Sequence, residues 1–402
     1  AVLKFYSKYI LGIFIVAAKR TPFGTLGGKF LNKSLTDLQE VAAKAAIVAG
    51  GLKPEQIDSV VIGNVLVNSS VDGIFAPRHV LLRVGIPLDR PALGVNRLCG
   101  SGFQSVVNGA QNILVGESQV VLTGGVDNMS QAPFVARNIR FGTPLGQNHI
   151  LEDSLWLGLT DSHCKTPMGV TAENLGAKYG IKREEVDAYA LRSQHLWKAA
   201  NDAGYFKEEL APVTVQIKKK DVVVDVDEHP RPETTAANLA KLPSIFKKDG
   251  LVTAGSASGI CDGAGAVILA SEEAVKSHGL KPLARLVGYS IVGVEPTIMG
   301  IGPAPAIRNL LKVTGKTLNE IDLIEINEAF GAQTLACAKD LELDMNKLNV
   351  NGGAIALGHP LAASGSRITS HLVHELRRKA KFGIGSACIG GGQGIALLLE
   401  SL

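Results

Sequence analysis

The stretch NRLCGSGFQS at residues 96–105 decides how the rest of this chain is interpreted. A short apolar run at 91–95 precedes it, and apolar residues at helical spacing follow from Val106 to Leu114, so the sequence predicts that a strand turns into a helix at Cys99. The free N–H groups of a helix start favour a thiolate, and the neighbouring glycines let another group approach closely. A single cysteine among small residues is more often a packed core thiol, so a nucleophile here requires partners elsewhere.

The composition is that of a globular protein with a large core. The chain has 402 residues, of which 46% are hydrophobic and 19% charged, enough for more than one folding unit. The apolar run at 10–18 is closed by Lys19 and Arg20 and is too short to cross a bilayer, so we expect no transmembrane segment. Five widely spaced cysteines give neither a disulfide framework nor a C-x-x-C metal pattern, which fits a reducing compartment. A net charge of +4 is too weak to argue for nucleic acid, but it suits an anionic small molecule.

The start of the chain is basic, and its first carboxylate is Asp37. Residues 2–11 mix lysine with apolar side chains, as an amphipathic mitochondrial targeting helix does, although arginine is absent there. We therefore expect residues 1–12 to form a targeting segment and the protein to lie in the mitochondrial matrix. A basic N-terminal arm is the alternative.

The first part of the chain alternates between strand and helix patterns. The predicted elements are a strand at 13–18, a helix at 34–49 capped by Ser34 or Thr36, a strand at 60–65, a helix at 75–84, the helix after Cys99 and a strand at 120–122. This order predicts an α/β domain with a largely parallel sheet that is covered on both faces.

The same order returns after about residue 282, which indicates an internal duplication. The predicted elements there are strands at 283–289, 323–326, 349–351 and 382–388 and helices at 303–313, 329–341 and 364–378. Ile57-Asp58 matches Ile321-Asp322 before corresponding strands, and Leu98, Ser101 and Gly102 match Leu361, Ser364 and Gly365 at nearly the same spacing.

Two halves built alike are expected to pair about a pseudo-twofold axis. In that register the loop of Cys99 in one half corresponds to the loop just after His359 in the other, and Gly125 corresponds to Cys388. We therefore expect Cys99, His359 and Cys388 to approach a shared interface.

Residues 131–250 break the alternation and are predicted to form an inserted lobe. They hold two helix patterns, at 168–179 and 183–203, and a lysine run at 218–220 that fits a solvated hairpin tip better than a phosphate site. A strand at 262–271 would return the chain to the first sheet. The predicted domains are therefore 13–272, including the inserted lobe at 131–250, and 280–402.

Three further motifs carry chemistry: NEAF at 327–330, NGGAIALGHP at 351–360 and CIGGGQG at 388–394. His359, between Gly and Pro just before a helix start, is poorly explained by packing, although an isolated histidine is more often structural. Cys388 is followed by three glycines, which puts a thiol beside free backbone N–H groups that can hold an oxyanion. Two thiols and an imidazole indicate covalent thioester chemistry with an acid–base cysteine.

With CGSG at 99–102 and MGVTAEN at 168–174, these motifs resemble those of the thiolases, which are acetyl-CoA C-acyltransferases, from about residue 13 to the C-terminus. The resemblance implies an α/β fold, namely a duplicated five-layered α-β-α-β-α arrangement with an inserted loop domain. It also implies cleavage of a 3-ketoacyl-CoA by CoA to acetyl-CoA and a shortened acyl-CoA. NRLC at 96–99 and DEHPRP at 227–232 favour the degradative type that serves fatty-acid β-oxidation in mitochondria.

The same resemblance assigns roles to particular residues. Cys99 would take the acyl group, and His359 would activate it and, with a water held by Asn327, stabilise the enolate oxygen. Cys388 would protonate the enolate carbon and later deprotonate CoA, while the N–H groups of Cys99 and Gly390 would hold the oxyanion. The residues expected to bind CoA are Arg231, Thr234 and Ser258. No metal or bound cofactor is implied, CoA being a co-substrate; the expected partners are acyl-CoA, CoA and further copies of the chain in a homodimer or homotetramer.

Some positions depart from the family pattern. Ala362, Gly331, Asp127 and Ser256 stand where the family usually has Gly, Ala, Glu and Asn, yet none of these changes removes a reacting group. Pro167 stands where acetoacetyl-CoA thiolases that run the condensation tend to have His, which favours the longer-chain, degradative type.

Several alternatives stay open at this stage. One is an acetoacetyl-CoA thiolase working in the direction of condensation, and another is a CoA-binding protein without activity. A decarboxylating ketoacyl synthase would share fold and nucleophile but would carry a histidine in place of Cys388. Thioester hydrolysis at the same site, with water in place of CoA, is a further activity that the sequence leaves open.

Overall fold

The computed structural model describes residues 12–402. The predicted targeting segment, apart from Gly12, lies outside the described residues. Among the residues described, no helix is both long and apolar enough to cross a membrane.

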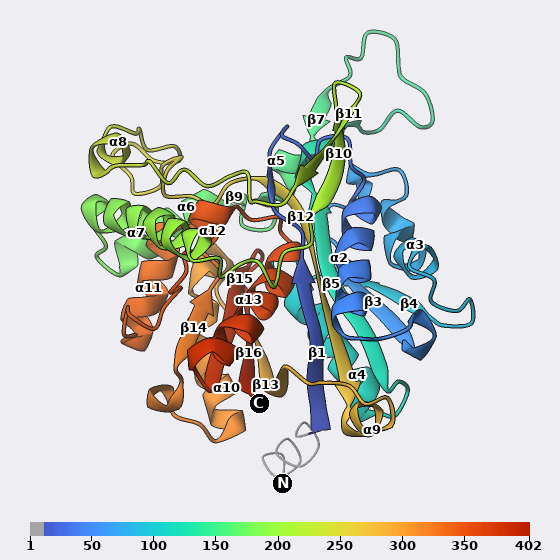
Figure 1. Cartoon of the computed structure of the whole chain (residues 1–402). Coiled ribbons are helices and arrows are strands. Elements are labelled where there is room, and N and C mark those ends of the chain that lie inside the picture. The colour runs from blue at the N-terminus through green and yellow to red at the C-terminus, as the bar shows by residue number, and fades with distance from the viewer. Residues whose placement is uncertain (1–11) are drawn as a thin grey trace.

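A ten-stranded sheet runs through the molecule and joins its two halves (Figure 1). Its halves are connected by β1 and β13, which pair through only two residue pairs, Phe14 with Arg285 and Ile15 with Ala284. The strands in their order across the sheet are β14 (Leu323–Ile326), β15 (Phe382–Ile389), β16 (Gln393–Ser401), β13 (Ala284–Gly293), β1 (Ile13–Arg20), β12 (Cys261–Ser271), β5 (Val120–Asn128), β3 (Ser59–Gly63) and β4 (Ala92–Val95), with β2 (Gly24–Thr25) beside β12.

Helices cover both faces of each half-sheet and produce the five layers. One core lies between the N-terminal half-sheet and its outer helices, a second between the half-sheets around the two central helices, and a third under the outer helices of the C-terminal half. The outer helices are α2 (Leu35–Ala49) and α3 (Ala76–Arg83) on one side and α10 (Pro303–Thr314) and α11 (Gly331–Leu341) on the other, the central ones are α4 (Ser101–Leu114) and α13 (Ala363–Lys379), and the short helices are α9 (Glu272–Ser277) and α12 (Ala354–Leu357). Ser34 caps α2 in a capping box with Asp37, as one of the two predicted caps.

The two central helices meet at their N-termini through glycine. A Cβ on Gly102 would lie 2.4 Å from the carbonyl oxygen of Ala362, and a Cβ on Gly365 would lie 2.3 Å from the backbone nitrogen of Phe103. Each glycine lets the other helix approach this closely. The contact is therefore the same in both directions, as expected for two halves related by a twofold axis. The duplication recurs at Asp58 and Asp322, whose carboxylates each accept two backbone N–H groups at the start of the neighbouring strand.

The inserted lobe lies over one end of the sheet. Its elements are β6 (Phe134–Ala136), β7 (Leu151–Asp153), α5 (Ser154–Gly158), β8 (Thr160–Asp161), β9 (Thr166–Pro167), α6 (Met168–Lys178), α7 (Arg183–Asp202), β10 (Val213–Ile217), β11 (Lys220–Val224) and α8 (Ala236–Ala240). In Figure 1 the helices α6, α7 and α8 lie near α11 and α12 of the C-terminal half, while the β10–β11 hairpin extends above the N-terminal half.

The prediction of a largely parallel sheet is wrong. Only β3 with β4, β3 with β5 and β14 with β15 are parallel pairs among the described strands of the large sheet. The other pairs are antiparallel, because β12 returns between β5 and β1 and because β16 folds back on β15 through a tight glycine turn. In that turn Gly391 and Gly392 have φ values of 77° and 84°, a backbone region that favours glycine.

The predicted strand at 349–351 is also absent as a strand. Asn349 has a φ of 46°, which breaks the extended backbone, so only isolated bridges form there, such as that between Ile324 and Leu348. The Asn349 side chain instead bonds the backbone of Ile326, with its Oδ1 accepting from the N–H and its Nδ2 donating to the carbonyl.

Candidate active site

Cys99 lies in a tight turn between β4 and α4, as predicted. Leu98, just before it, has a φ of 46°, a conformation that is uncommon for a non-glycine residue and clusters at functional sites. Ser101 holds this turn, because its Oγ accepts from Arg97 N at 2.9 Å and donates to Leu98 O at 2.7 Å. Asn96 Oδ1 also accepts from Leu98 N. The strained turn therefore presents the thiol at the helix start.

The thiol of Cys99 lies among backbone donors, and the residue is only partly exposed. The N–H groups of Gly390 and of Cys99 itself are hydrogen-bonded to it and favour the thiolate, whereas burial raises the pKa to about 11 and the Asp127 carboxyl contributes in the same direction. The thiol is therefore neutral at pH 7 in the free enzyme, and the two N–H groups face the atom that would carry an acyl group.

His359 is buried and aligned by two side chains. Its Nδ1 lies 2.5 Å from Ser364 Oγ, and its Nε2 lies 3.4 Å from Asn327 Nδ2. Because the amide nitrogen of Asn327 is a donor and faces Nε2, we assign the ring proton to Nδ1, which donates to Ser364 Oγ, so that Nε2 keeps its lone pair. Burial, with a smaller contribution from Arg367, lowers the pKa of His359 to about 3. The imidazole is neutral at pH 7, as a general base must be.

Cys388 is fully buried at the end of β15. It packs against Met299 and Ala329, and the charge of a Cys99 thiolate would act on it directly. Burial raises the pKa of Cys388 well above its usual value. The second thiol is thus held in its protonated form next to the first, and the two halves of the fold contribute one cysteine each.

An apolar cavity of about 200 Å³ opens at Cys99 and His359. Cys99 and His359 lie in its wall, together with Ser258, whose Oγ donates to the Ala329 carbonyl at 3.1 Å. The other lining residues are Met129, Trp156, Leu159, Pro167, Met168, Gly169, Ile245, Phe246, Ala257, Gly259, Ile260, Met299, Ala329, Phe330 and Leu361.

Arg231 and Thr234 lie in a second cavity, of about 220 Å³, and not in the one that contains Ser258. Ala254 and Gly255 line this second cavity, so one loop, 254–260, contributes to the walls of both. Gln194 Oε1 accepts from Arg231 N at 2.9 Å and holds the turn that carries Arg231. The sequence grouped all three residues together, whereas the structure puts Ser258 in the wall of the first cavity and Arg231 and Thr234 in the wall of the second.

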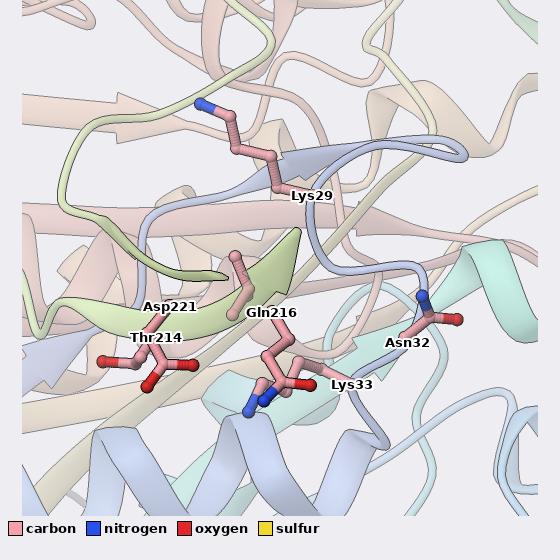
Figure 2. Close-up of a pocket in the computed structure, with 7 residues that line it drawn as sticks. Lys29, Asn32, Lys33, Thr214, Gln216 and Asp221 are labelled. Carbon is pink, nitrogen blue, oxygen red and sulfur yellow. The ribbon is translucent and has the colours of Figure 1, made fainter. Parts of the chain in front are cut away.

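A larger cavity, of about 530 Å³, lies away from these residues between the 29–33 loop and the β10–β11 hairpin. Figure 2 shows the ends of Lys29 and Asn32 pointing away from each other, so their donors do not converge on one ligand position. Lys218 and Lys219 form the exposed turn of the hairpin, which confirms the interpretation of the lysine run as a solvated tip. Within residues 12–402, no group of three or more His, Cys, Asp or Glu side chains is arranged to hold a metal ion.

Three side chains around the site were not assigned a role from the sequence: Ser364, Asp127 and Glu328. Ser364 is hydrogen-bonded to His359 Nδ1. Its position one helical turn after Pro360 is the feature of the sequence that could have indicated this contact. Asp127 and Glu328 are fully buried carboxylates within or beside the quoted motifs. Their contacts are long-range, so no local pattern could reveal them.

The two pKa shifts at the site predict the pH dependence of Cys99 reactivity. Since Cys99 titrates near 11 and His359 near 3, no thiolate–imidazolium pair exists between pH 6 and 9. Alkylation of Cys99 by iodoacetamide should therefore rise about tenfold per pH unit from pH 7 to 10. Mass spectrometry of the Cys99 peptide at fixed times measures this rate. A rate that is constant between pH 6 and 8 would contradict the neutral pair.

Comparison with known proteins agrees with this geometry. The family model "Thiolase, N-terminal domain" matches residues 13–273, and "Thiolase, C-terminal domain" matches residues 280–401. The chain therefore belongs to the thiolase family, acyltransferases that catalyse CoA-dependent thiolytic cleavage.

Individual relatives and solved structures show how similar the chain is to particular thiolases. The chain is 62% identical over 391 residues to human "3-ketoacyl-CoA thiolase, mitochondrial", covering 97% of this chain and 98% of that protein. An acetyl-CoA acetyltransferase of Syntrophomonas wolfei is 45% identical over 395 residues, covering 97% and 99%. The crystal structure of human mitochondrial 3-ketoacyl-CoA thiolase superposes with a TM-score of 0.97 over 98% of this chain and 100% of that one. A further structure of that human protein, in complex with CoA, superposes with a TM-score of 0.96 over 98% and 99%.

Proposed function

We propose that this chain is a 3-ketoacyl-CoA thiolase of fatty-acid β-oxidation, which transfers the acyl group of a 3-ketoacyl-CoA to CoA and releases acetyl-CoA. The observation that carries the proposal is that Cys99 from the N-terminal half and a neutral His359 from the C-terminal half line one apolar cavity, with the buried thiol of Cys388 close enough to Cys99 to feel its charge. The likeness to the mitochondrial 3-ketoacyl-CoA thiolases supports the substrate class.

In the first half-reaction, His359 Nε2 takes the Cys99 proton as the sulfur attacks C3 of the substrate. The resulting oxyanion accepts from the N–H groups of Cys99 and Gly390, the donors that already contact the thiol. The C2–C3 bond then breaks, its electron pair passes to the enolate of acetyl-CoA, and the acyl group remains on Cys99.

The enolate needs a stabilised oxygen and a proton at carbon. His359 and a water held by Asn327 supply the first, which fits Asn327 Oδ1, a buried acceptor with no partner among the described side chains. Cys388 supplies the proton to carbon, and its thiolate then takes the proton of the incoming CoA. The CoA sulfur attacks the acyl–Cys99 thioester, the shortened acyl-CoA leaves, and the released Cys99 thiolate takes its proton back from His359.

For CoA we propose two segments of contact. Ser258 lines the same cavity as Cys99 and would contact the pantetheine arm, whereas Arg231 and Thr234 line the second cavity and would contact the phosphorylated nucleotide. The loop 254–260 that lines both cavities provides the path between them. The basic, acid-free start of the sequence and the names of the relatives support a place in the mitochondrial matrix.

We also propose a homodimer or homotetramer. The strand β4 is at the edge of the large sheet, and no strand within residues 12–402 pairs with its outer side, which could therefore pair with a second copy. Exposed apolar side chains are frequent in β4 and in the segment that leads to it, and others occur in the lobe between Phe134 and Trp156. Those at positions 71–93 are Val71, Ile74, Phe75, Leu82, Leu88 and Leu93.

Thiolysis assays with acetoacetyl-CoA and with C6 to C16 3-ketoacyl-CoAs test the proposal. We expect the kcat/KM for at least one of the longer substrates to be tenfold or more above that for acetoacetyl-CoA. The reason is that each methylene buried in an apolar cavity contributes about 0.8 kcal/mol of binding free energy. Cleavage of acetoacetyl-CoA alone would favour the acetoacetyl-CoA thiolase, and CoA binding without turnover of any of these would overturn the proposal.

A further inference from the structure

The loop from Asn349 to Ala362 carries His359, and buried carboxylates contact both of its ends. The first is Glu328, which follows Asn327 directly and is completely buried. Its Oε2 accepts from Ile355 N at 3.0 Å, and its Oε1 accepts from Asn349 Nδ2 at 3.0 Å. The carboxylate therefore fixes the beginning of the loop relative to Asn327, the residue that contacts His359.

Glu328 also ties this loop to the lobe. Tyr189 Oη donates to its Oε1 at 2.8 Å, and Ser193 Oγ donates to its Oε2 at 2.7 Å; both residues belong to α7. A Cβ on Gly353 would lie 2.4 Å from Glu328 Cδ, so the carboxylate packs directly on the loop backbone. All four donors are neutral, and together they define the position of both carboxylate oxygens.

The second carboxylate is Asp127, at the end of β5. Its Oδ2 accepts from Ala362 N at 2.7 Å, three residues after His359. Its Oδ1 accepts from Asn64 Nδ2, Val65 N and Leu66 N, at 2.9 to 3.1 Å. This carboxylate thus joins the far end of the loop to the N-terminal half, and it lies close enough to Cys99 to act on its charge.

We propose that Glu328 and Asp127 are positioning residues which brace the His359 loop at its two ends and so hold the imidazole in register with Asn327 and Cys99. Neither carboxylate contacts the reacting atoms in the proposed mechanism. The inference rests on the role proposed above for His359, because positioning matters only if that imidazole works in the reaction.

The test compares Glu328→Gln and Asp127→Asn with a matched control, Asp58→Asn. Asp58 accepts backbone N–H groups in the same way, from Gln119 and Val120, but at the opposite end of β5 from Asp127. In Glu328→Gln and Asp127→Asn an amide –NH2 takes the place of an oxygen that accepts from N–H groups, so the brace is weakened with little change of volume, whereas in Asp58→Asn the amide oxygen can keep both N–H groups, since both donate to Oδ2. Rates are normalised to the amount of Cys99 that an acyl-CoA can acylate, which removes any contribution of unfolded protein.

The brace predicts that kcat per acylatable site falls about 10- to 100-fold in Glu328→Gln and Asp127→Asn, with KM for CoA within about twofold of wild type. Tyr189→Phe, which removes one hydroxyl, should fall less but in the same direction. The double variant should lose less than the product of the two single losses, because both act on one loop. Asp58→Asn should keep the wild-type kcat.

A kcat per acylatable site within twofold of wild type in both variants, or losses no larger than that of Asp58→Asn, would overturn the brace. So would multiplicative losses in the double variant. If wild type cleaves 3-ketoacyl-CoA and His359→Ala does not, the proposed function stands whatever the brace variants show, so the two failures are distinguishable.

Discussion

Cys99→Ala is expected to lose thiolysis by about 10⁴-fold or more, since no other side chain at the cavity can form the acyl intermediate at that position. His359 and the N–H donors of Gly390 and residue 99 would remain, but they would have no nucleophile to activate and no bound oxyanion to stabilise. Steady-state kinetics with a 3-ketoacyl-CoA, combined with CoA binding by calorimetry, separate loss of chemistry from loss of binding.

Cys164→Ala is the matched control for this variant. Cys164 is also a partly exposed free thiol, and it belongs to the lobe rather than to the cavity wall. Its replacement should leave kcat unchanged. Turnover that survives in Cys99→Ala at more than about a hundredth of the wild-type rate would mean that another group is acylated.

Cys388→Ser is expected to slow carbon proton exchange by two or more decades, the usual contribution of a general base. In deuterated buffer the wild type should introduce deuterium at C2 of acetyl-CoA, because enolate formation is reversible. Burial already raises the pKa of the native Cys388 thiol. A serine hydroxyl is a far weaker acid than a thiol, so in Cys388→Ser the pKa of the side chain at this position would be higher still, and proton transfer to and from the carbon would be slow.

Acyl transfer to Cys99 should suffer less in the same variant, because no carbon proton moves in that step. The acylation rate with a simple acyl-CoA, measured beside the exchange rate, therefore separates the two thiols. Deuterium exchange at the wild-type rate in Cys388→Ser would exclude this cysteine as the carbon base and would assign both roles to His359.

The sequence predicted the elements that depend on local pattern. The strand-to-helix turn at Cys99, the Ser34 cap and the two lobe helices follow from short-range spacing and capping chemistry, and the structure has all of them. The match of Gly102 with Gly365 predicted an internal duplication, and in the structure these two glycines lie where the central helices meet, because a duplicated chain repeats its packing constraints. Cys99 and His359 lie at one cavity for the same reason.

The rest depends on contacts between distant residues. Nothing local distinguishes a parallel from an antiparallel partner for β12, and an asparagine with positive φ at 349 looks like an ordinary strand residue in sequence. Glu328 stood within a quoted motif, yet its role depends on Tyr189 and Ser193, more than a hundred residues away. The separation of Arg231 from Ser258 likewise appears only when loop 254–260 is folded.

The most direct test of the account is to trap the acyl intermediate and locate it. The protein is mixed with an acyl-CoA in the absence of free CoA, quenched in acid, digested and analysed by mass spectrometry. We predict one acyl group per chain, on the peptide containing Cys99, which is removed when CoA is added before the quench. An adduct on Cys388, or full turnover with no adduct on Cys99, would contradict the central claim that Cys99 carries the acyl group.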